Sequence, residues 1–384
     1  MGILTNRKVV DFIKIQFPKQ EFIPLHEPKF LGNEKKYLID CIDSTFVSSV
    51  GKYVDSFEIE LAKYTGAKYA VACVNGTAAL HMALLVAGVK ARDLVLTQPL
   101  SFIATCNAIS YIGAEPLFID VDMDTLGLSP EKLDKYLSVF GVIKADGFTY
   151  HKTTNQKISA CVPMHTFGHP CKIDEIAIIC KKYNIRLIED AAESIGSYYK
   201  DQHTGTFGDI GTFSFNGNKT ITSGGGGAIV TNNKEIAAKA KYLTTQAKVP
   251  HRWDFVHDEI GYNYRLPNIN AALLCAQLEQ LNFFVNNKRE LAKIYSNYFN
   301  SEEMKFVDEP LHSKSNYWLC AILLKDEKAR LDFLTYTNDN GVMTRPIWKL
   351  MNTLTIFDKC LTGNLDNALE IETRLVNIPS SVRV

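Results

Sequence analysis

The sequence lacks long hydrophobic runs and lacks an excess of either charge. No stretch approaches the roughly 18 apolar residues that a membrane-crossing helix needs, and the segment from Met1 to Arg7 is too polar for a signal peptide. Lys plus Arg number 42 and Asp plus Glu number 42, so the formal net charge is zero. A neutral chain gives no support for a nucleic-acid or membrane partner, and we predict neither.

Clustered cysteines are absent as well. The nine cysteines are scattered along the chain, and none forms a Cys-x-x-Cys pair. Because a zinc site needs grouped ligands, we predict no metal site. Most of the cysteines stand among apolar neighbours, as Cys275 does, which is typical of buried free thiols in a reducing compartment. The sequence therefore predicts a cytoplasmic protein.

Short apolar runs alternate with helix-like stretches over about the first 250 residues. Strand candidates lie at residues 70–74, 94–98, 116–121, 160–165, 186–189, 212–215 and 227–230, and helix candidates lie at 77–87, 103–112 and 172–183. Strands that alternate with helices are typical of βαβ units, so we predict an α/β fold with a mostly parallel sheet.

The pattern changes after about residue 250. We predict a long helix at 268–291, a separate helix at 294–299, a strand at 318–324, a helix at 329–338 and a loop that contains Arg345 and Pro346. A short amphipathic helix is predicted at 9–17. The chain is therefore divided into an N-terminal arm (1–28), a large domain (29–255) and a smaller α+β domain (256–384).

Two residues whose side chains can take part in catalysis lie before and after the strand predicted at 212–215. Asp190 follows an apolar strand, and Lys219 lies in a polar loop between two strands, beside four consecutive glycines at 224–227. In an open α/β sheet, ligands bind outside the carboxyl ends of the strands. Both residues are predicted to lie at that edge.

The residue types fit one cofactor, pyridoxal phosphate. A lysine amine holds its aldehyde, and a carboxylate keeps its pyridine nitrogen protonated. Its phosphate needs backbone N–H groups at a helix N-terminus, which Asn75-Gly76-Thr77 supplies. Phe102, at a strand end, offers a ring that can stack on the pyridine.

Each of these features also has an ordinary structural interpretation. A loop lysine is usually solvated, and an aspartate at a strand end usually caps a helix. Asn75-Gly76-Thr77 is typical of a turn or cap, 224–227 of a hairpin turn, and Phe102 of a core residue. The order of the whole set along the chain favours the cofactor site.

That order resembles the DegT/DnrJ/EryC1/StrS family of sugar aminotransferases, which have the aspartate-aminotransferase fold (fold type I). The resemblance covers about residues 22–384. The matching stretches are 75–77, 101–105, 120–122, 189–193, 214–219, 224–228 and 261–266. Residues 24–28, 46–51 and 344–348 resemble the subgroup that acts in legionaminic-acid and related bacterial surface-sugar pathways.

The resemblance implies roles for individual residues. Lys219 would be the Schiff-base lysine and proton shuttle, and Asp190 the partner of the pyridine nitrogen. The cofactor-binding set would be Gly76, Thr77, Phe102, Asp190, Glu193, Ser214, Lys219 and Asn263. Glu193 matches a position near the phenolic oxygen of the cofactor that is often Gln or His. Asn263 matches a residue that reaches the phosphate of the neighbouring subunit, which implies a homodimer with shared active sites.

The resemblance also implies the reaction. We expect transfer of an amino group from L-glutamate to C4 of a nucleotide-linked 4-keto-6-deoxyhexose, with a UDP-linked 2-acetamido sugar favoured and a GDP-linked sugar possible. Candidate substrate contacts are Arg345, His26, His251 and Arg252, although the histidines are also interpretable as surface residues. Two alternatives stay open: a 3-dehydratase of the same family, in which a histidine replaces the lysine, and a regulatory protein that has lost the chemistry.

Overall fold

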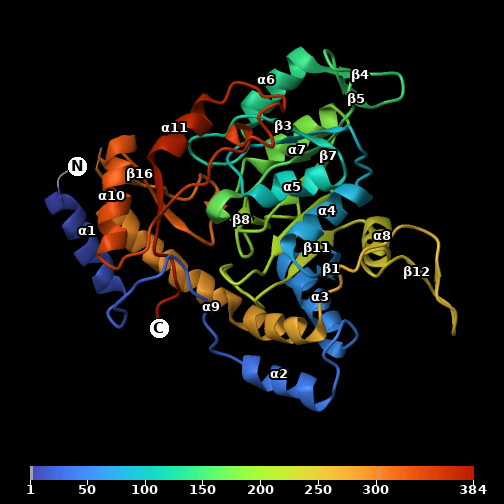
Figure 1. Ribbon diagram of the computed structural model, residues 1–384, viewed down its shortest axis with the longest axis horizontal. Coiled ribbons are helices and arrows are strands. Elements are labelled where there is room, and N and C mark those ends of the chain that lie inside the picture. Colours follow the sequence, from blue (N-terminus) through green and yellow to red (C-terminus); the bar gives the residue numbers. More distant parts are fainter. Residues whose placement is uncertain (1–2, 302) are drawn as a thin grey trace.

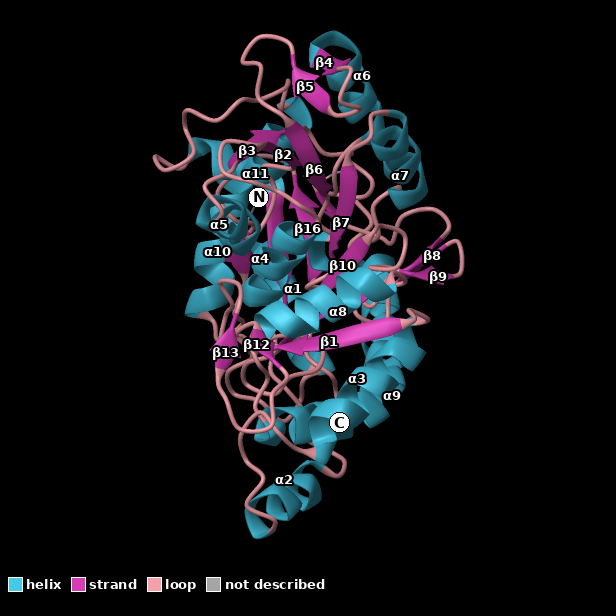
Figure 2. Cartoon of the chain, turned by 90° about the vertical axis from the view of Figure 1, so that its right-hand side faces the viewer, coloured by secondary structure: helices cyan, strands magenta, loops and turns pink. Residues whose placement is uncertain are grey.

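In the computed structural model, which describes residues 3–301 and 303–384, a seven-stranded sheet forms the centre of the larger lobe (Figures 1 and 2). The strand order is β1-β11-β10-β7-β6-β2-β3. These strands are β1 (Tyr69–Cys73), β2 (Leu94–Thr97), β3 (Glu115–Phe118), β6 (Ile158–Val162), β7 (Arg186–Asp190), β10 (Ile210–Ser214) and β11 (Gly227–Thr231). Strand β11 is antiparallel to both of its neighbours, and the other adjacent pairs are parallel. The predicted sheet, mostly parallel, is confirmed.

Helices cover both faces of this sheet, so its central strands are buried along their length. The helices are α3 (Lys52–Thr65), α4 (Gly76–Val86), α5 (Ile103–Tyr111), α6 (Pro130–Phe140), α7 (Ile173–Lys182) and α8 (Lys234–Thr244). Alternate residues of β2 point to opposite faces. Val95 packs in the core formed with α4 and α5, whereas Leu94 and Leu96 pack with α6 and α7.

A second, antiparallel sheet lies in the smaller lobe, in the order β14-β16-β18-β17. Its strands are β14 (Met304–Phe306), β16 (Cys320–Leu324), β17 (Arg345–Pro346) and β18 (Leu375–Ile378), and its helices are α10 (Glu327–Asp339) and α11 (Asp366–Arg374). Helix α1 (Ile3–Gln16) packs here too, since Val9 and Ile13 share a core with Phe333. Met1 and Gly2 of the predicted arm lie outside the described residues.

The long helix α9 (Asn268–Tyr298) joins the two lobes (Figure 1). Its first half packs against α2 (Glu34–Asp43) and α3, and its second half reaches the core of the smaller lobe. The predicted break near residue 292 is wrong. The helix contains neither Gly nor Pro, and Leu291, Ala292 and Tyr295 stay buried in one core across the expected break.

The predicted loop at Arg345 and Pro346 is also wrong in part. These two residues form β17, which pairs with β18 at the edge of the small sheet. Proline is tolerated at an edge because its missing N–H faces no neighbouring strand. The remaining elements are short: η1 (Thr166–Gly168), η2 (Met351–Thr353), β4 (Gly141–Ile143), β5 (Thr149–His151), β8 (Tyr198–Tyr199), β9 (Gln202–His203), β12 (Lys248–Val249), β13 (Val256–His257) and β15 (Ser313–Lys314).

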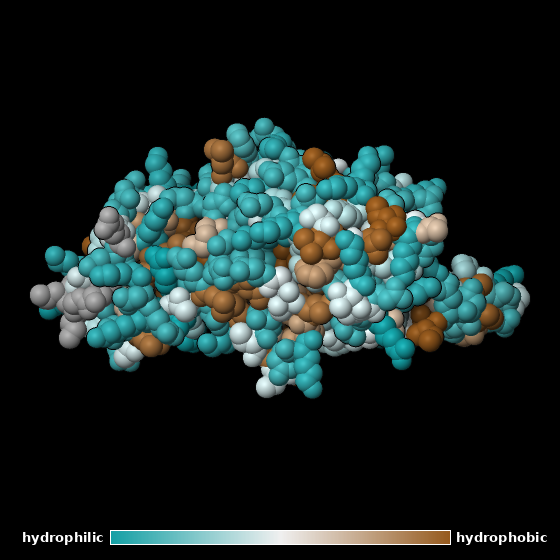
Figure 3. All heavy atoms as spheres, turned by 90° about the horizontal axis from the view of Figure 1, so that it is seen from above, coloured by the Kyte–Doolittle hydropathy of each residue, from teal (hydrophilic) through white to brown (hydrophobic). Residues whose placement is uncertain are grey.

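The surface is mixed, and the face shown in Figure 3 is mostly hydrophilic, with separate hydrophobic groups. Within residues 3–301 and 303–384, no helix combines the length and apolarity required to cross a membrane. The same residues contain no group of three or more His, Cys, Asp or Glu side chains placed to hold a metal ion. All nine cysteines are free, and eight of them are buried.

Candidate active site

A cavity of about 310 Å³ opens at the carboxyl ends of the parallel strands. It is lined by seven of the residues predicted to hold the cofactor: Gly76, Thr77, Phe102, Asp190, Glu193, Ser214 and Lys219. Each lies at the end of, or after, one of the strands β1, β2, β7 and β10, and the sheet brings these strand ends to one edge. The structure thus places together residues that are far apart in the sequence.

Lys219 is not a solvated loop lysine. Its side chain is 11% exposed. The amine donates a hydrogen bond to Oε1 of Glu193 at 3.4 Å, and it lies 4.0 Å from the ring centroid of Trp318. A confined amine beside a buried carboxyl group can exchange protons within the cavity.

Asp190 is a buried residue of the cavity lining, at the end of β7. One carboxylate oxygen accepts a hydrogen bond from Oγ1 of Thr105 at 2.7 Å, and the other accepts one from the backbone N–H of Ala192 at 3.2 Å. No helix begins at this residue, so it is not the helix cap that a strand-end aspartate often is. Burial raises the pKa of Asp190, and the bond from Thr105 opposes that rise. A buried carboxylate of this kind is stabilised by a cationic partner such as a protonated pyridine.

Glu193 is fully enclosed next to Lys219. Its Oε2 accepts a hydrogen bond from the backbone N–H of Phe167 at 2.8 Å. Burial raises the pKa of Glu193 to about 7, although the nearby charge of Lys219 acts in the opposite direction. The carboxyl group therefore gains and loses its proton near neutral pH, which a glutamine at this position could not do.

This pKa predicts a pH-dependent effect of Glu193→Gln on the cofactor-free protein. The pKa is raised from 4.5 to about 7 in the folded state. The carboxyl group therefore contributes stability below about pH 4.5, and this contribution is lost as the pH rises through about 7. We expect the variant to gain stability relative to the wild type over that interval, by on the order of 3 kcal/mol. Thermal unfolding at several pH values measures the difference.

The matched control for this experiment is Glu21→Gln, which changes an exposed glutamate. Its difference from the wild type is expected to stay constant over the same pH interval. A constant difference for Glu193→Gln would contradict the raised pKa.

The turn before α4 forms a cradle for an anion. The side chain of Asn75 caps the helix by accepting the backbone N–H of Ala78 at 2.8 Å, so the predicted cap is present. Gly76 and Thr77, the first residues of α4, line the cavity together with Ser214, and the first N–H groups of a helix have no partner within it. A Cβ on Gly76 would lie 2.7 Å from Cβ of Ser214, so a larger residue would close the cradle. These donors fit the phosphate of the cofactor.

The glycine run at 224–227 supports the same cradle. Gly224 has φ +78, which serves the turn before β11. A Cβ on Gly227 would collide with the carbonyl group of Asn75. Both interpretations of the run therefore hold at different positions: one glycine makes a turn, and another allows the backbone to approach the phosphate-binding turn closely.

Phe102 lies on the open side of the cavity and is not a core residue, since 49% of its surface is exposed. Trp318 and Trp348 complete the lining from the C-terminal part of the chain. Neither tryptophan was predicted from the sequence as a site residue. Trp348 lies in one of the stretches that resembled the subgroup, which was the one signal available for it.

Five predicted residues do not line this cavity, and four of them are exposed. His251 and Arg252 are exposed between β12 and β13, where Nδ1 of His251 lies 3.3 Å from Asp254. Arg345 is exposed on β17. The side chain of Asn263 is exposed and accepts hydrogen bonds from Arg265 at 3.0 and 3.1 Å. Their predicted contacts would need the substrate or a second subunit, and they stay predictions.

His26 lies near the cavity but does not line it. Burial lowers the pKa of His26 well below its ordinary value, and the charges of Lys288 and Lys219 lower it further. Among the described residues, neither of its ring nitrogens has a hydrogen-bond partner, and both nitrogens are buried. It is therefore not an ordinary surface histidine, and its role as a substrate contact stays a prediction.

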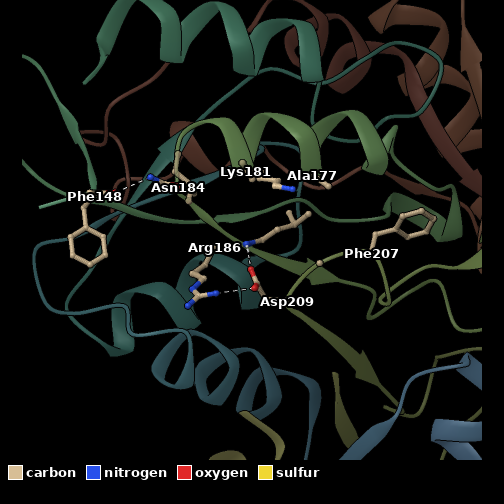
Figure 4. A pocket seen from close by; sticks show the side chains of 12 residues that line it. Phe148, Ala177, Lys181, Asn184, Arg186, Phe207 and Asp209 are labelled. Atoms are coloured by element: carbon tan, nitrogen blue, oxygen red, sulfur yellow. Dashed lines mark hydrogen bonds and ion pairs between the residues drawn. The ribbon is translucent and has the colours of Figure 1, made fainter. Parts of the chain in front are cut away.

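A larger cavity, of about 610 Å³, lies at the opposite ends of β7 and β10 (Figure 4). Arg186 donates a hydrogen bond to Asp209 at 3.0 Å, and Asp209 also accepts the backbone N–H of Leu187 at 3.0 Å. These two charges neutralise each other, and no predicted site residue lines this cavity. The candidate site is therefore identified by its position at the carboxyl ends of the strands, and not by the volume of its cavity.

Known proteins are similar to this chain in sequence and fold. The family model described as the DegT/DnrJ/EryC1/StrS aminotransferase family matches residues 29–384. GDP-perosamine synthase of Escherichia coli O157:H7 is 38% identical over 362 residues, which cover 94% of this chain and 93% of that protein. UDP-4-amino-4,6-dideoxy-N-acetyl-beta-L-altrosamine transaminase of Campylobacter jejuni subsp. jejuni serotype O:23/36 is 36% identical over 279 residues, 72% of this chain and 66% of that protein. A DegT DnrJ EryC1 StrS aminotransferase from Brucella abortus has a TM-score of 0.82 at 26% identity, covering 91% of this chain and 90% of that one.

The fold and the site together define a pyridoxal-phosphate-dependent aminotransferase of fold type I. The chain belongs to the DegT/DnrJ/EryC1/StrS aminotransferase family. The family, the fold class and the cofactor predicted from the sequence are confirmed. The roles of the individual residues stay predictions, which the experiments below test.

Proposed function

We propose that this enzyme transfers the amino group of L-glutamate to C4 of a nucleotide-linked 4-keto-6-deoxyhexose. The observation that carries this proposal is the placement of the Lys219 amine, 3.4 Å from Glu193 and 4.0 Å from the Trp318 ring centroid, in a cavity that Asp190 also lines. Pyridoxal phosphate, when bound, supplies an electron sink that makes the α-carbon of an amino acid acidic.

The residues of the chain have distinct tasks in this reaction. Asp190 holds the proton on the pyridine nitrogen, since a buried carboxylate favours a cation beside it. The Nζ of Lys219 removes the α-proton of glutamate and later returns a proton to C4 of the sugar. Glu193 holds or releases a proton next to that amine. The turn at Gly76 and Ser214 fixes the phosphate, which keeps the reacting atoms aligned.

A nucleotide-sugar substrate is supported by the names of the relatives, which include one GDP-linked and one UDP-linked sugar. The test is a panel of UDP-, GDP- and dTDP-linked 4-keto-6-deoxy sugars, each supplied with L-glutamate and analysed by mass. The expected result is one 4-amino product, with the UDP-linked 2-acetamido sugar and the GDP-linked sugar as the leading candidates. Activity on no member of the panel would overturn the sugar substrate and leave the cofactor assignment intact.

A 3-dehydratase is the second candidate, and Lys219 disfavours it. The family resemblance implies a histidine at this position in the dehydratases, whereas here Lys219 lines the cavity. The retained lysine and the buried Asp190 also disfavour a regulatory protein without chemistry, because such a protein has no need to keep either group. Mass analysis of the sugar distinguishes the three, since amination, loss of water and no change give different masses.

We also propose a homodimer in which each subunit completes the site of the other. Asn263 is exposed and does not line the cavity of its own chain. The neighbouring β12–β13 segment projects from the molecule (Figure 1). It carries exposed hydrophobic side chains at Trp253, Phe255 and Val256, and the exposed Ile260 follows it. Such a segment is stabilised by burial against a second copy.

Shared sites predict recovery of activity when two inactive variants are mixed. In a hybrid dimer of Lys219→Ala and Asn263→Ala chains, one site carries both defects and the other carries neither. Random exchange makes half of the dimers hybrid, so we expect about a quarter of the wild-type activity. Activity is measured before and after subunit exchange. A mixture that only averages the two separate variants would contradict shared sites.

A further inference from the structure

The wall of the cavity that the smaller lobe supplies is aromatic. Trp348 contacts Phe102 with its ring centroid 6.1 Å away in an edge-to-face arrangement. Phe167 is fully buried behind both tryptophans, with centroids 5.3 Å from Trp348 and 6.5 Å from Trp318. The two indole rings are therefore held in place by packing, and they face a cavity whose polar side chains belong to the larger lobe.

The ring of Trp318 offers the cavity no free polar group. Its Nε1–H donates a hydrogen bond to the backbone carbonyl of Asn218 at 2.6 Å, and the residue is 4% exposed. The same ring lies 4.0 Å from the amine of Lys219. A carbon that exchanges a proton with this amine must therefore lie close to the indole surface.

Resting on the proposed function, we propose that Trp318 and Trp348 form the surface that takes the apolar edge of the sugar, and that Trp348 sets the preference for a sugar without oxygen at C6. In a hexose, C6 is attached to C5, which is bonded to the reacting C4. When C4 lies near Lys219, C6 therefore lies within reach of the indole wall. A methyl group packs on the face of an indole ring, whereas a hydroxyl group against that face would lose water without gaining a hydrogen bond, because the face carries no N–H group or oxygen.

The size of the effect follows from the same chemistry. A hydrophobic surface discriminates against an added hydroxyl group by roughly 10- to 100-fold. We therefore expect the wild-type holoenzyme to bind a nucleotide-linked 4-amino-4,6-dideoxyhexose that much more tightly than the matching 4-amino-4-deoxyhexose, which differs by one hydroxyl group at C6. Dissociation constants are measured by calorimetry, with GDP- and UDP-linked forms of each pair.

The variants separate a specific role from a structural one. Trp348→Ala is expected to reduce the preference to within about 3-fold, because the discriminating surface is gone. Trp348→Phe keeps an aromatic surface and is expected to keep most of the preference. Phe148→Ala, at the cavity on the opposite edge of the sheet, is the matched control and is expected to change nothing.

Two results would overturn the inference. Equal binding of the two sugars by the wild type would do so, as would an unchanged preference in a folded Trp348→Ala protein that still aminates the 4-keto sugar. In both cases the proposed function stands. Failure of the wild type to aminate any nucleotide sugar would overturn the proposed function and this inference together.

Discussion

Replacing Lys219 by alanine is expected to abolish transamination. The amine is the group that can bond to the cofactor aldehyde, and it is also the base nearest to the reacting atoms. Loss of a positioned general base alone costs up to about 10⁴-fold in kcat, and loss of the covalent attachment adds to it. The purified wild type is expected to be yellow, with a visible absorbance band that Lys219→Ala lacks.

Two controls make this experiment specific. Lys325→Ala removes an exposed lysine of the smaller lobe and is expected to keep both the colour and the activity. Lys219→Arg keeps the positive charge but cannot bond to the aldehyde, so it should behave like Lys219→Ala. If the wild type binds pyridoxal phosphate no more tightly than Lys219→Ala, Lys219 is not the anchor of the cofactor.

Replacing Asp190 by asparagine is expected to reduce activity by about 10²- to 10⁴-fold while the cofactor stays attached. An amide has nearly the shape of the carboxylate but cannot hold a proton on the pyridine nitrogen, so the electron sink is weakened. Lys219 is unchanged, so the protein should remain coloured. Retained colour with lost activity distinguishes this variant from Lys219→Ala.

The hydrogen bonds of Asp190 predict a graded series. Thr105→Val removes the 2.7 Å bond to the carboxylate but leaves its charge, so we expect a loss of about 10-fold at most. Asp201→Asn changes an exposed aspartate and is expected to have no effect. Steady-state kinetics with glutamate and the sugar identified by the panel measure all three. Full activity in Asp190→Asn would contradict the proposed role of this carboxylate.

Much of the cofactor site could be predicted because its residues lie at predictable points of βαβ units. Asp190 ends a strand, Ser214 ends another, and Asn75-Gly76 caps the helix after a third. Parallel strands bring these points to one edge whatever the details of packing. The same reasoning could not decide whether Phe102 is a core residue or a cavity residue, or whether Lys219 is solvated or enclosed. In the structure Phe102 is exposed at the cavity and the side chain of Lys219 is enclosed.

The aromatic wall could not be predicted in the same way. Trp318 donates its indole N–H to Asn218, 100 residues earlier in the chain, and no local pattern links the two. The prediction of a helix break near residue 292 was wrong for a related reason. Local composition suggested two helices, but burial of one continuous face in the smaller lobe stabilises a single helix.

The sequence by itself determined the class of chemistry. A lysine, an aspartate and a phosphate-binding turn, each placed at a strand end in a fixed order, identify the cofactor because few other ligands need that set. The tertiary structure decided what surrounds the lysine. Glu193 lies next to Lys219, and its burial raises its pKa to about 7. Packing of the smaller lobe brings Trp318 and Trp348 to the cavity. Burial and long-range packing depend on the whole fold, so no stretch of sequence specifies them alone.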